Sequence, residues 1–175
     1  MDYKLSPCTE SELPEILEIF NEAIKNTTAV YDYKPRTPEM IRQWYGKKSD
    51  GNYPVIGAFD KSGSLLGFAT YGPFRDRPAY KYTVEHSIYV RSDYRGKGLG
   101  TILLREIIKN AENQDYHMMI GGIDAANEGS IRFHEKEGFV LCGLIKQAGF
   151  KFGRWLDLAF YQLILKTPEH PVEDR

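Results

Sequence analysis

The chain has 175 residues, the length of a single domain, and no internal linker or repeat divides it. Its formal net charge is −1, whereas a general binder of nucleic acid or of anionic membranes needs an excess of Lys and Arg, so neither partner is expected. Its two cysteines stand apart, without CxxC spacing or a companion cluster of histidines. We therefore expect neither a disulfide framework nor a metal site.

No stretch approaches the roughly 18 apolar residues that a bilayer-spanning helix needs, and the first residues lack the basic and apolar pattern of a leader. A cytoplasmic protein is the default expectation. We predict one domain over residues 1–166 and a frayed, polar tail over residues 167–175, which holds two prolines.

The first half of the chain predicts two helices, each preceded by a capping residue. After a short strand over residues 3–5, either Thr9 or Ser11 caps a helix that holds Pro14 in its first turn. Thr37, followed by a proline, starts the second helix. Two strands over residues 55–59 and 65–71 then flank a turn that ends at a glycine, which is typical of a hairpin; a loop over residues 72–78 follows.

The middle of the chain reads as a strand, a glycine-rich turn and a helix in unbroken succession. Residues 83–90 are rich in β-branched and aromatic side chains, Arg95-Gly-Lys-Gly-Leu-Gly100 follows, and apolar residues then recur at helical spacing up to Ala111. Glycines let backbone N–H groups approach a ligand, and a helix N-terminus favours phosphate. The same order also occurs as a mere connection, so these residues alone leave anion binding open.

Two common phosphate motifs are excluded. Thr101 stands where a dinucleotide fingerprint needs its third glycine, and no Gly-Lys-Ser/Thr triplet marks a P-loop. The last third of the chain predicts a strand over residues 117–123, a helix over 130–137 that Gly138 stops, and strands over 139–145 and 158–165 around an aromatic loop.

The turn from Arg95 to Gly100 resembles the Arg/Gln-x-x-Gly-x-Gly/Ala pyrophosphate loop of the GNAT family of N-acetyltransferases. Residues 85–90, 127–139 and 149–157 are further similar to its phosphinothricin and methionine sulfoximine acetyltransferase branch. The resemblance implies an α/β (α+β) fold: a mixed, mostly antiparallel sheet with flanking helices and a V-shaped split between the fourth and fifth strands. It also implies a homodimer.

In that fold the pantetheine arm of acetyl-CoA pairs with the fourth strand as an added strand, and the glycine-rich loop holds the pyrophosphate. Asn127 is expected at the pantetheine amide, although its place before a short helix equally suits an N-cap. The resemblance therefore implies these cofactor-binding residues: Ile88, Tyr89, Val90, Arg95, Gly96, Lys97, Gly98, Leu99, Gly100, Thr101 and Asn127.

An amine must lose a proton before it attacks a thioester, and Glu85 on the central strand is the candidate base, acting directly or through water. Its alternative role is an ordinary salt bridge. His134 stands where the family often has a tyrosine that protonates the departing thiolate; a single helical histidine is equally often structural.

A carboxylate on the acceptor suits recognition by guanidinium groups, and the resemblance places the loop before the central strand at the acceptor pocket. The implied substrate-binding residues are Arg75, Asp76, Arg77, Glu85, His86 and Ser87. Phe150, Phe152 and Trp155 either form another wall of the pocket or pack in the core.

The expected activity is direct transfer of acetyl, in a ternary complex, to the α-amino group of methionine sulfoximine, methionine sulfone or phosphinothricin, which detoxifies these compounds. Acetylation of another small amine or a protein N-terminus remains an alternative, as does a CoA-binding sensor without catalysis.

Overall fold

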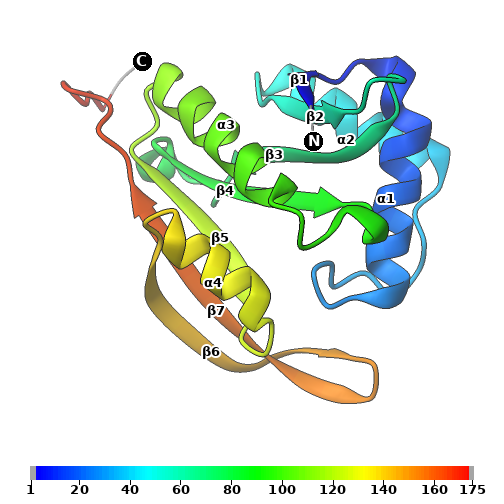
Figure 1. The fold of residues 1–175 in the computed structure, drawn as a ribbon. Helices are drawn as coiled ribbons and strands as arrows, with labels where there is room; N and C mark the ends of the chain where they lie inside the picture. Colours follow the sequence, from blue (N-terminus) through cyan, green and yellow to red (C-terminus); the bar gives the residue numbers. More distant parts are fainter. Residues whose placement is uncertain (1–2, 174–175) are drawn as a thin grey trace. The chain divides into compact units, whose positions relative to one another are not determined.

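The structure is a computed structural model that describes residues 3–173, in which seven strands form one sheet in the order β1-β2-β3-β4-β5-β7-β6 (Figure 1). β4 and β5 run parallel, while β1 with β2, β2 with β3, β5 with β7 and β6 with β7 are antiparallel. The predicted mixed, mostly antiparallel sheet with helices is confirmed. The elements are β1 (Lys4–Pro7), α1 (Leu13–Asn26), α2 (Pro38–Asp50), β2 (Val55–Phe59), β3 (Leu65–Pro73), β4 (Thr83–Val90), α3 (Leu99–Asn113), β5 (Met118–Asp124), α4 (Glu128–Lys136), β6 (Val140–Lys151) and β7 (Arg154–Ile164).

Two compact units share these elements. The first runs up to Thr70 and includes Ser87–Ile107; the second consists of Tyr71–His86 and the chain from Ile108 onward. The prediction of a single domain over residues 1–166 stays a prediction, and residues 1, 2, 174 and 175 lie outside the described part. No helix within residues 3–173 is long and apolar enough to cross a bilayer.

In the first unit, α1 buries one apolar face because its large side chains recur every three or four residues. Ile16, Phe20 and Ile24 are each at most 2% exposed and belong to a core shared with β2 and β3. Neither Thr9 nor Ser11 caps α1, because its N-cap is Glu12, whose side chain makes no capping hydrogen bond. Thr9 instead caps a short 3-10 turn just before α1, where its Oγ1 accepts from Ser11 N at 3.3 Å in a capping box.

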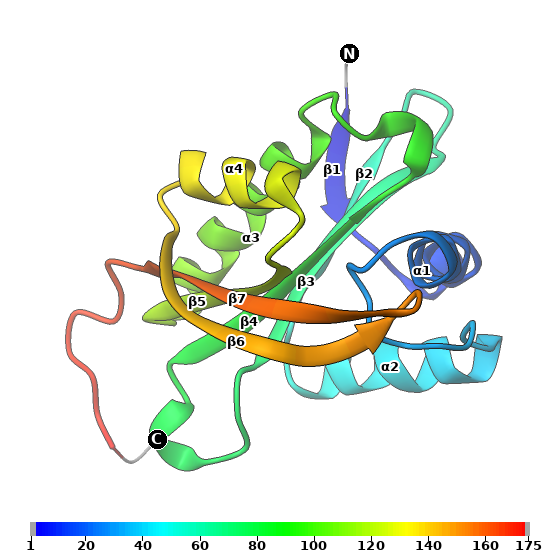
Figure 2. The same cartoon turned by 90° about the horizontal axis from the view of Figure 1, so that it is seen from below.

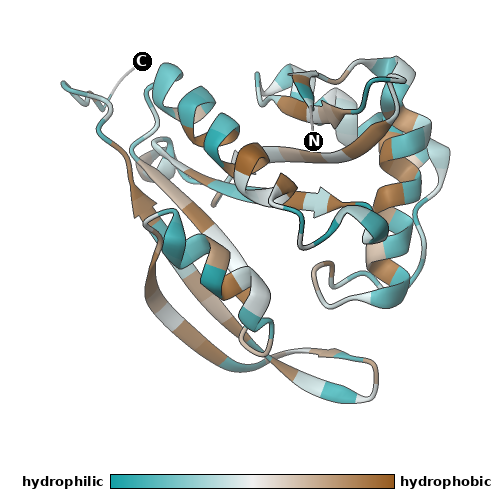
Figure 3. Cartoon of the chain, viewed as in Figure 1, coloured by the Kyte–Doolittle hydropathy of each residue, from teal (hydrophilic) through white to brown (hydrophobic). Residues whose placement is uncertain are grey.

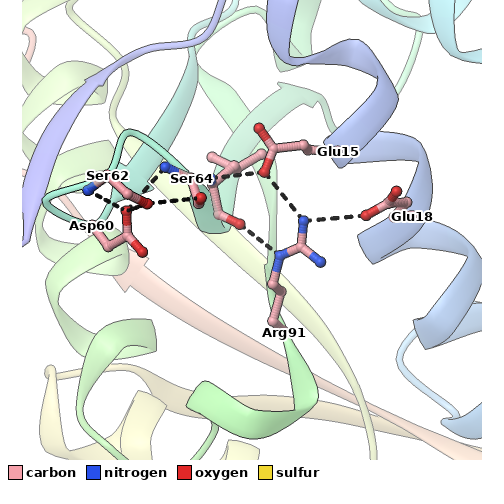
Figure 4. Close-up of polar contacts among 7 residues, drawn as sticks. Glu15, Glu18, Asp60, Ser62, Ser64 and Arg91 are labelled. Carbon is pink, nitrogen blue, oxygen red and sulfur yellow. Dashed lines mark hydrogen bonds and ion pairs between the residues drawn. The ribbon is translucent and has the colours of Figure 1, made fainter.

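The turn between β2 and β3 is built by Asp60. Its carboxylate accepts from the backbone N–H groups of Ser62 at 2.8 Å and Ser64 at 3.0 Å (Figure 4), and Gly63 adopts φ +86°. A short acidic residue that bonds the backbone two residues on and a glycine with positive φ are what a tight turn requires. The predicted hairpin is confirmed.

In the second unit, β6 and β7 form a long hairpin (Figure 2), so the aromatic loop expected between shorter strands is wrong. The turn is only Phe152-Gly153, with φ of +53° and +74°. Two successive positive φ values match the right-handed twist of paired strands. Glycine adopts this conformation easily, whereas Phe152 is held there by the pairing on either side.

The predicted tail is not frayed in its described part. Thr167 Oγ1 donates to Tyr116 O at 2.6 Å. Further along, the Tyr82 hydroxyl is 3.0 Å from both the N and the O of Val172. These bonds hold residues 167–173 against the second unit.

Candidate functional site

The glycine-rich turn between β4 and α3 presents open backbone. Gly96 and Gly98 have φ of +72° and +82°, and a Cβ built on either would meet no atom within 4 Å. Within the described residues, the N–H groups of Gly96, Lys97 and Gly98 donate to no other backbone group. α3 starts directly afterwards at Leu99. The turn thus has the donors and the helix terminus that an anion needs.

The side chains of this turn are already engaged. Arg95 Nε donates to Val90 O at 3.1 Å, and its guanidinium forms an ion pair with Glu22. The Lys97 ammonium lies 5.0 Å from the centre of the Tyr94 ring. Arg95 therefore ties the turn to α1. The open N–H groups are the better candidates for binding a phosphate.

Arg91 is a structural residue that the sequence did not reveal. Its Nε donates to Leu65 O at 2.7 Å, and its guanidinium lies 3.2 Å from both Glu15 and Glu18 (Figure 4). It thereby fixes the end of β4 to β3 and α1, just ahead of the glycine-rich turn. No local pattern predicts these contacts, because the partners of Arg91 are far away in the sequence.

The second half of β4 packs through its aromatic side chain. The Tyr89 ring lies 4.7 Å from Phe20 and 5.4 Å from Phe68, centre to centre. Gly67 on β3 has no side chain, and a Cβ there would stand 2.8 Å from Tyr89 O. The Tyr89 side chain is structural, and the predicted contact of pantetheine with the backbone of Ile88–Val90 stays a prediction.

Glu85 is half-buried on the part of β4 that belongs to the second unit. The parallel register pairs it with Ile120 and reaches no further than this pair; the split of β4 and β5 beyond this point stays a prediction. A Cβ on Gly122 would stand 3.1 Å from Glu85 Oε1 and within 4 Å of Leu158 and Phe160. The carboxylate thus lies beside the backbone of Gly122, in space that exists because β5 has a glycine there.

His86, the next residue, has a different environment. Successive side chains of a strand point to opposite faces. His86 is 7% exposed, and its Nε2 lies 3.2 Å from Nε2 of His134, which is 3% exposed. Burial lowers the pKa of both imidazoles, and His134 lowers that of His86 further. His86 is therefore joined to His134 and does not share the surroundings of Glu85.

Asn127 fills the structural role that the sequence left open. Its Oδ1 accepts from Ser130 N at 3.1 Å and caps α4. One oxygen of the side chain is thus committed to the helix. Its predicted contact with pantetheine stays a prediction.

The acceptor loop is exposed and reaches the surroundings of Glu85 through aromatic contacts. Arg75, Asp76 and Arg77 are all exposed, and the Arg75 guanidinium lies 5.0 Å from the Phe74 ring. Phe74 in turn packs edge-on against Phe160 at 6.4 Å, and Phe160 lies within 4 Å of the point where a Cβ on Gly122 would stand. Ser87 is half-buried on β4.

The three aromatic residues of the β6–β7 hairpin do not pack in a core of this chain. Phe150, Phe152 and Trp155 are 45%, 56% and 59% exposed, and Phe150 packs edge-on against Trp155 at 5.2 Å. Their place in a pocket stays a prediction. In the described residues, no three His, Cys, Asp or Glu side chains are placed to hold a metal ion.

Known proteins match almost the whole chain. A model of the acetyltransferase (GNAT) family matches residues 13–139. An L-methionine sulfoximine/L-methionine sulfone acetyltransferase of Pseudomonas aeruginosa is 44% identical over 155 residues, which covers 89% of this chain and 90% of that protein.

Two solved structures have the same fold. The ribosomal-protein-alanine N-acetyltransferase of Brucella melitensis is 41% identical, with a TM-score of 0.90 over 93% of this chain and 99% of that one. The phosphinothricin acetyltransferase of Sinorhizobium meliloti, in complex with acetyl-CoA, is 36% identical, with a TM-score of 0.92 over 97% of this chain and 95% of that one. The chain therefore belongs to the acetyltransferase (GNAT) family.

Proposed function

We propose that this protein transfers acetyl from acetyl-CoA to the α-amino group of methionine sulfoximine, methionine sulfone or phosphinothricin, by direct transfer in a ternary complex, and thereby detoxifies them. The half-buried carboxylate of Glu85, whose Oε1 lies 3.1 Å from the point where a side chain on Gly122 would begin, is the observation that carries the proposal. The names of the Pseudomonas aeruginosa and Sinorhizobium meliloti relatives support the acceptors.

Acetyl-CoA supplies the acetyl group as a thioester. Glu85 takes a proton from the ammonium group of the acceptor, directly or through water, so that the amine can attack. Arg75 and Arg77 face the acceptor's carboxylate with paired donors. The backbone of Ile88–Val90 and the N–H groups of residues 95–101 hold the coenzyme.

An amine panel tests the proposal. The protein is incubated with acetyl-CoA and each of the three acceptors, with methionine and glutamate as close controls, and the release of free CoA is followed. Turnover with the three analogues above that of the controls supports the proposal. Absence of CoA release with all five amines, while acetyl-CoA binds, would instead favour the sensor.

A protein N-terminus is the second candidate acceptor, because the Brucella melitensis relative is named for acetylating a ribosomal protein. A peptide that begins with alanine belongs in the same assay. Preference for the peptide over methionine sulfone would replace the first acceptor class with the second.

We also propose a homodimer through β6, the edge strand of the sheet. Apolar side chains remain exposed along it, and Figure 3 shows apolar stretches on β6 and β7. An unpaired strand with an apolar surface needs a partner. The exposed apolar residues are Val140, Leu141, Leu144 and Ile145 on β6 and Ile164 on β7, whose exposed fractions are 48% to 57%. Light scattering after gel filtration measures the mass; Leu144→Glu is expected to give monomers, and a monomeric wild type would contradict the proposal.

A further inference from the structure

His86 and His134 form a buried pair that neither base catalysis by Glu85 nor the coenzyme contacts proposed above involve. The two rings are stacked, with centres 5.0 Å apart and planes 23° apart, and Phe139 packs edge-on against both. β5 makes room for them, since a Cβ on Gly121 would stand 2.8 Å from His86 Nε2 and 3.4 Å from His134 Nε2. Two imidazole groups brought this close share a hydrogen bond that fixes their protons.

The positions of the protons follow from the bonding partners. His134 Nδ1 lies 2.7 Å from the carbonyl oxygen of Ser130. A carbonyl only accepts, so Nδ1 carries the hydrogen, and in neutral His134 Nε2 is then a bare acceptor. His86 Nε2 must donate to it across 3.2 Å, which leaves His86 Nδ1 without a hydrogen.

The pair has room for one further proton. His86 Nδ1 is buried and has no hydrogen-bond partner among the described residues. When the pair gains one proton, His134 Nε2 carries a hydrogen and becomes the donor to His86 Nε2. His86 is then in its Nδ1–H form, with Nε2 as the acceptor. A second additional proton would set two N–H groups against each other at 3.2 Å.

Among the described residues, no charged side chain is a cause of the shifted pKa values of the pair. The shifts come from burial, from the other imidazole and from the Ser130 carbonyl. β4 contributes His86, α4 contributes His134 and Ser130, and β5 contributes Gly121. Because burial disfavours the charged form, the pair is neutral near pH 7.

We propose that His86 is a positioning residue that hydrogen-bonds His134, so that the two rings form a one-proton unit, which takes up a single additional proton. His134 delivers a proton only when the pair carries this additional proton. This rests on the proposed function insofar as the acceptor of that proton is the departing CoA thiolate. In that step the N–H bond at His134 Nε2 breaks and an S–H bond forms, while the hydrogen on His86 Nδ1 returns to His86 Nε2, so that the pair is again neutral. Solvent then restores its proton.

Nitrogen NMR tests the unit without any turnover. The protein, labelled with ¹⁵N in its four histidines, is titrated from about pH 8 to about pH 5, with signals assigned by His86→Gln and by substitution of His117 and His170. We expect a hydrogen on Nδ1 of His134 and on Nε2 of His86 in the neutral form, and one shared midpoint for both rings. A hydrogen on His134 Nε2 in the neutral protein, or independent uptake of one proton by each ring, would overturn the proposal.

Kinetics test the consequence. The Gln amide either donates or accepts where His86 Nε2 stood, so His86→Gln should lower kcat less, and shift its pH profile less, than a residue that makes no hydrogen bond. His86→Leu should lower kcat by about ten-fold and alter the pH profile, with little change in KM. This loss is smaller than the rate loss of about 10²–10⁴-fold that follows removal of an acid–base group itself. Equal kcat and equal pH profiles in the Gln and Leu variants would refute a positioning role.

Gly121→Ala covers the case in which His86→Leu fails to fold. Its methyl group should separate the two rings, so that they no longer titrate with one shared midpoint. Gly46→Ala, whose Cβ meets nothing within 4 Å, should keep the shared midpoint. A shared midpoint that survives in Gly121→Ala would count against the geometry. If the wild type turns over no amine, the proposed function fails, while the NMR result still decides whether the one-proton unit exists.

Discussion

Glu85 Oε1 lies 3.1 Å from the point at which a side chain on Gly122 would begin. β5 therefore leaves space for the carboxylate, and any side chain at residue 122 takes that space. Gly122→Val should displace the carboxylate and lower kcat/KM by at least about ten-fold, because a misplaced base loses most of its effect. Gly46→Ala, with open space around its Cβ, is the control. Unchanged kcat/KM in a folded Gly122→Val would show that this position of Glu85 is not the active one.

Glu85→Gln keeps the size of the side chain and removes its basicity. If Glu85 is the base, kcat falls by about 10²–10⁴, while the Kd for acetyl-CoA, measured by calorimetry, stays within about two-fold. The loss should be partly restored at high pH, where more of the free amine is present. Wild-type turnover by Glu85→Gln would remove this residue from the mechanism.

Local patterns predicted the elements whose signals lie within a few residues. Residues 83–90 form β4 as expected, and Thr37 caps α2 by accepting from Met40 N at 3.3 Å. The β6–β7 hairpin was missed because Gly149 and Gly153 interrupt the strand pattern. Pairing between the strands outweighs that local preference, and local sequence does not display it.

The contacts of the candidate site likewise differ in whether local sequence predicts them. Glu85 and His86 were both predicted to bind substrate, yet the alternation of a strand already separates neighbouring side chains. The partner of His86 is 48 positions away in sequence. Gly122, which leaves space for the Glu85 carboxylate, likewise comes from another strand, β5. Their contacts depend on sheet register, which a single sequence does not reveal.

The glycine-rich turn gives the next prediction. Gly98→Ala places a Cβ at φ +82°, where side chains are strained, and this should shift the N–H groups of the turn. We expect the Kd for acetyl-CoA to rise by about ten-fold or more, as for the loss of a charge-assisted hydrogen bond or two. Acetyl-pantetheine, which lacks the pyrophosphate, distinguishes the site, because its Kd should be the same for Gly98→Ala and the wild type. An unchanged Kd would place the pyrophosphate elsewhere.

The two cysteines should differ in reactivity. Burial, followed by the charges of Glu12 and Glu15, raises the pKa of the Cys8 thiol to about 12, and Cys8 is 4% exposed. Cys142 is exposed. A thiol reagent at about pH 8 should therefore modify Cys142 alone in the folded protein and both residues in urea. Rapid reaction of folded Cys142→Ser would show that Cys8 is accessible.

The histidine pair also predicts how stability depends on pH. Burial holds the pKa of His86 and His134 below the value of about 6.5 that a histidine has in the unfolded chain. Below that pH the histidines of the unfolded chain bind more protons than those of the folded protein, so the free energy of unfolding falls as the pH falls. The contribution of the pair is fully present above about pH 6.5.

Urea unfolding at about pH 5, 6, 7 and 8 measures this dependence. His86→Gln removes one of the two groups, so its free energy of unfolding should fall less steeply between about pH 7 and 5 than that of the wild type, by about 1.4 kcal/mol for each unit of pKa depression. His170→Gln, at an exposed residue, should keep the wild-type slope. The same slope in all three proteins would mean that the pair takes up protons in the folded protein as readily as in the unfolded chain.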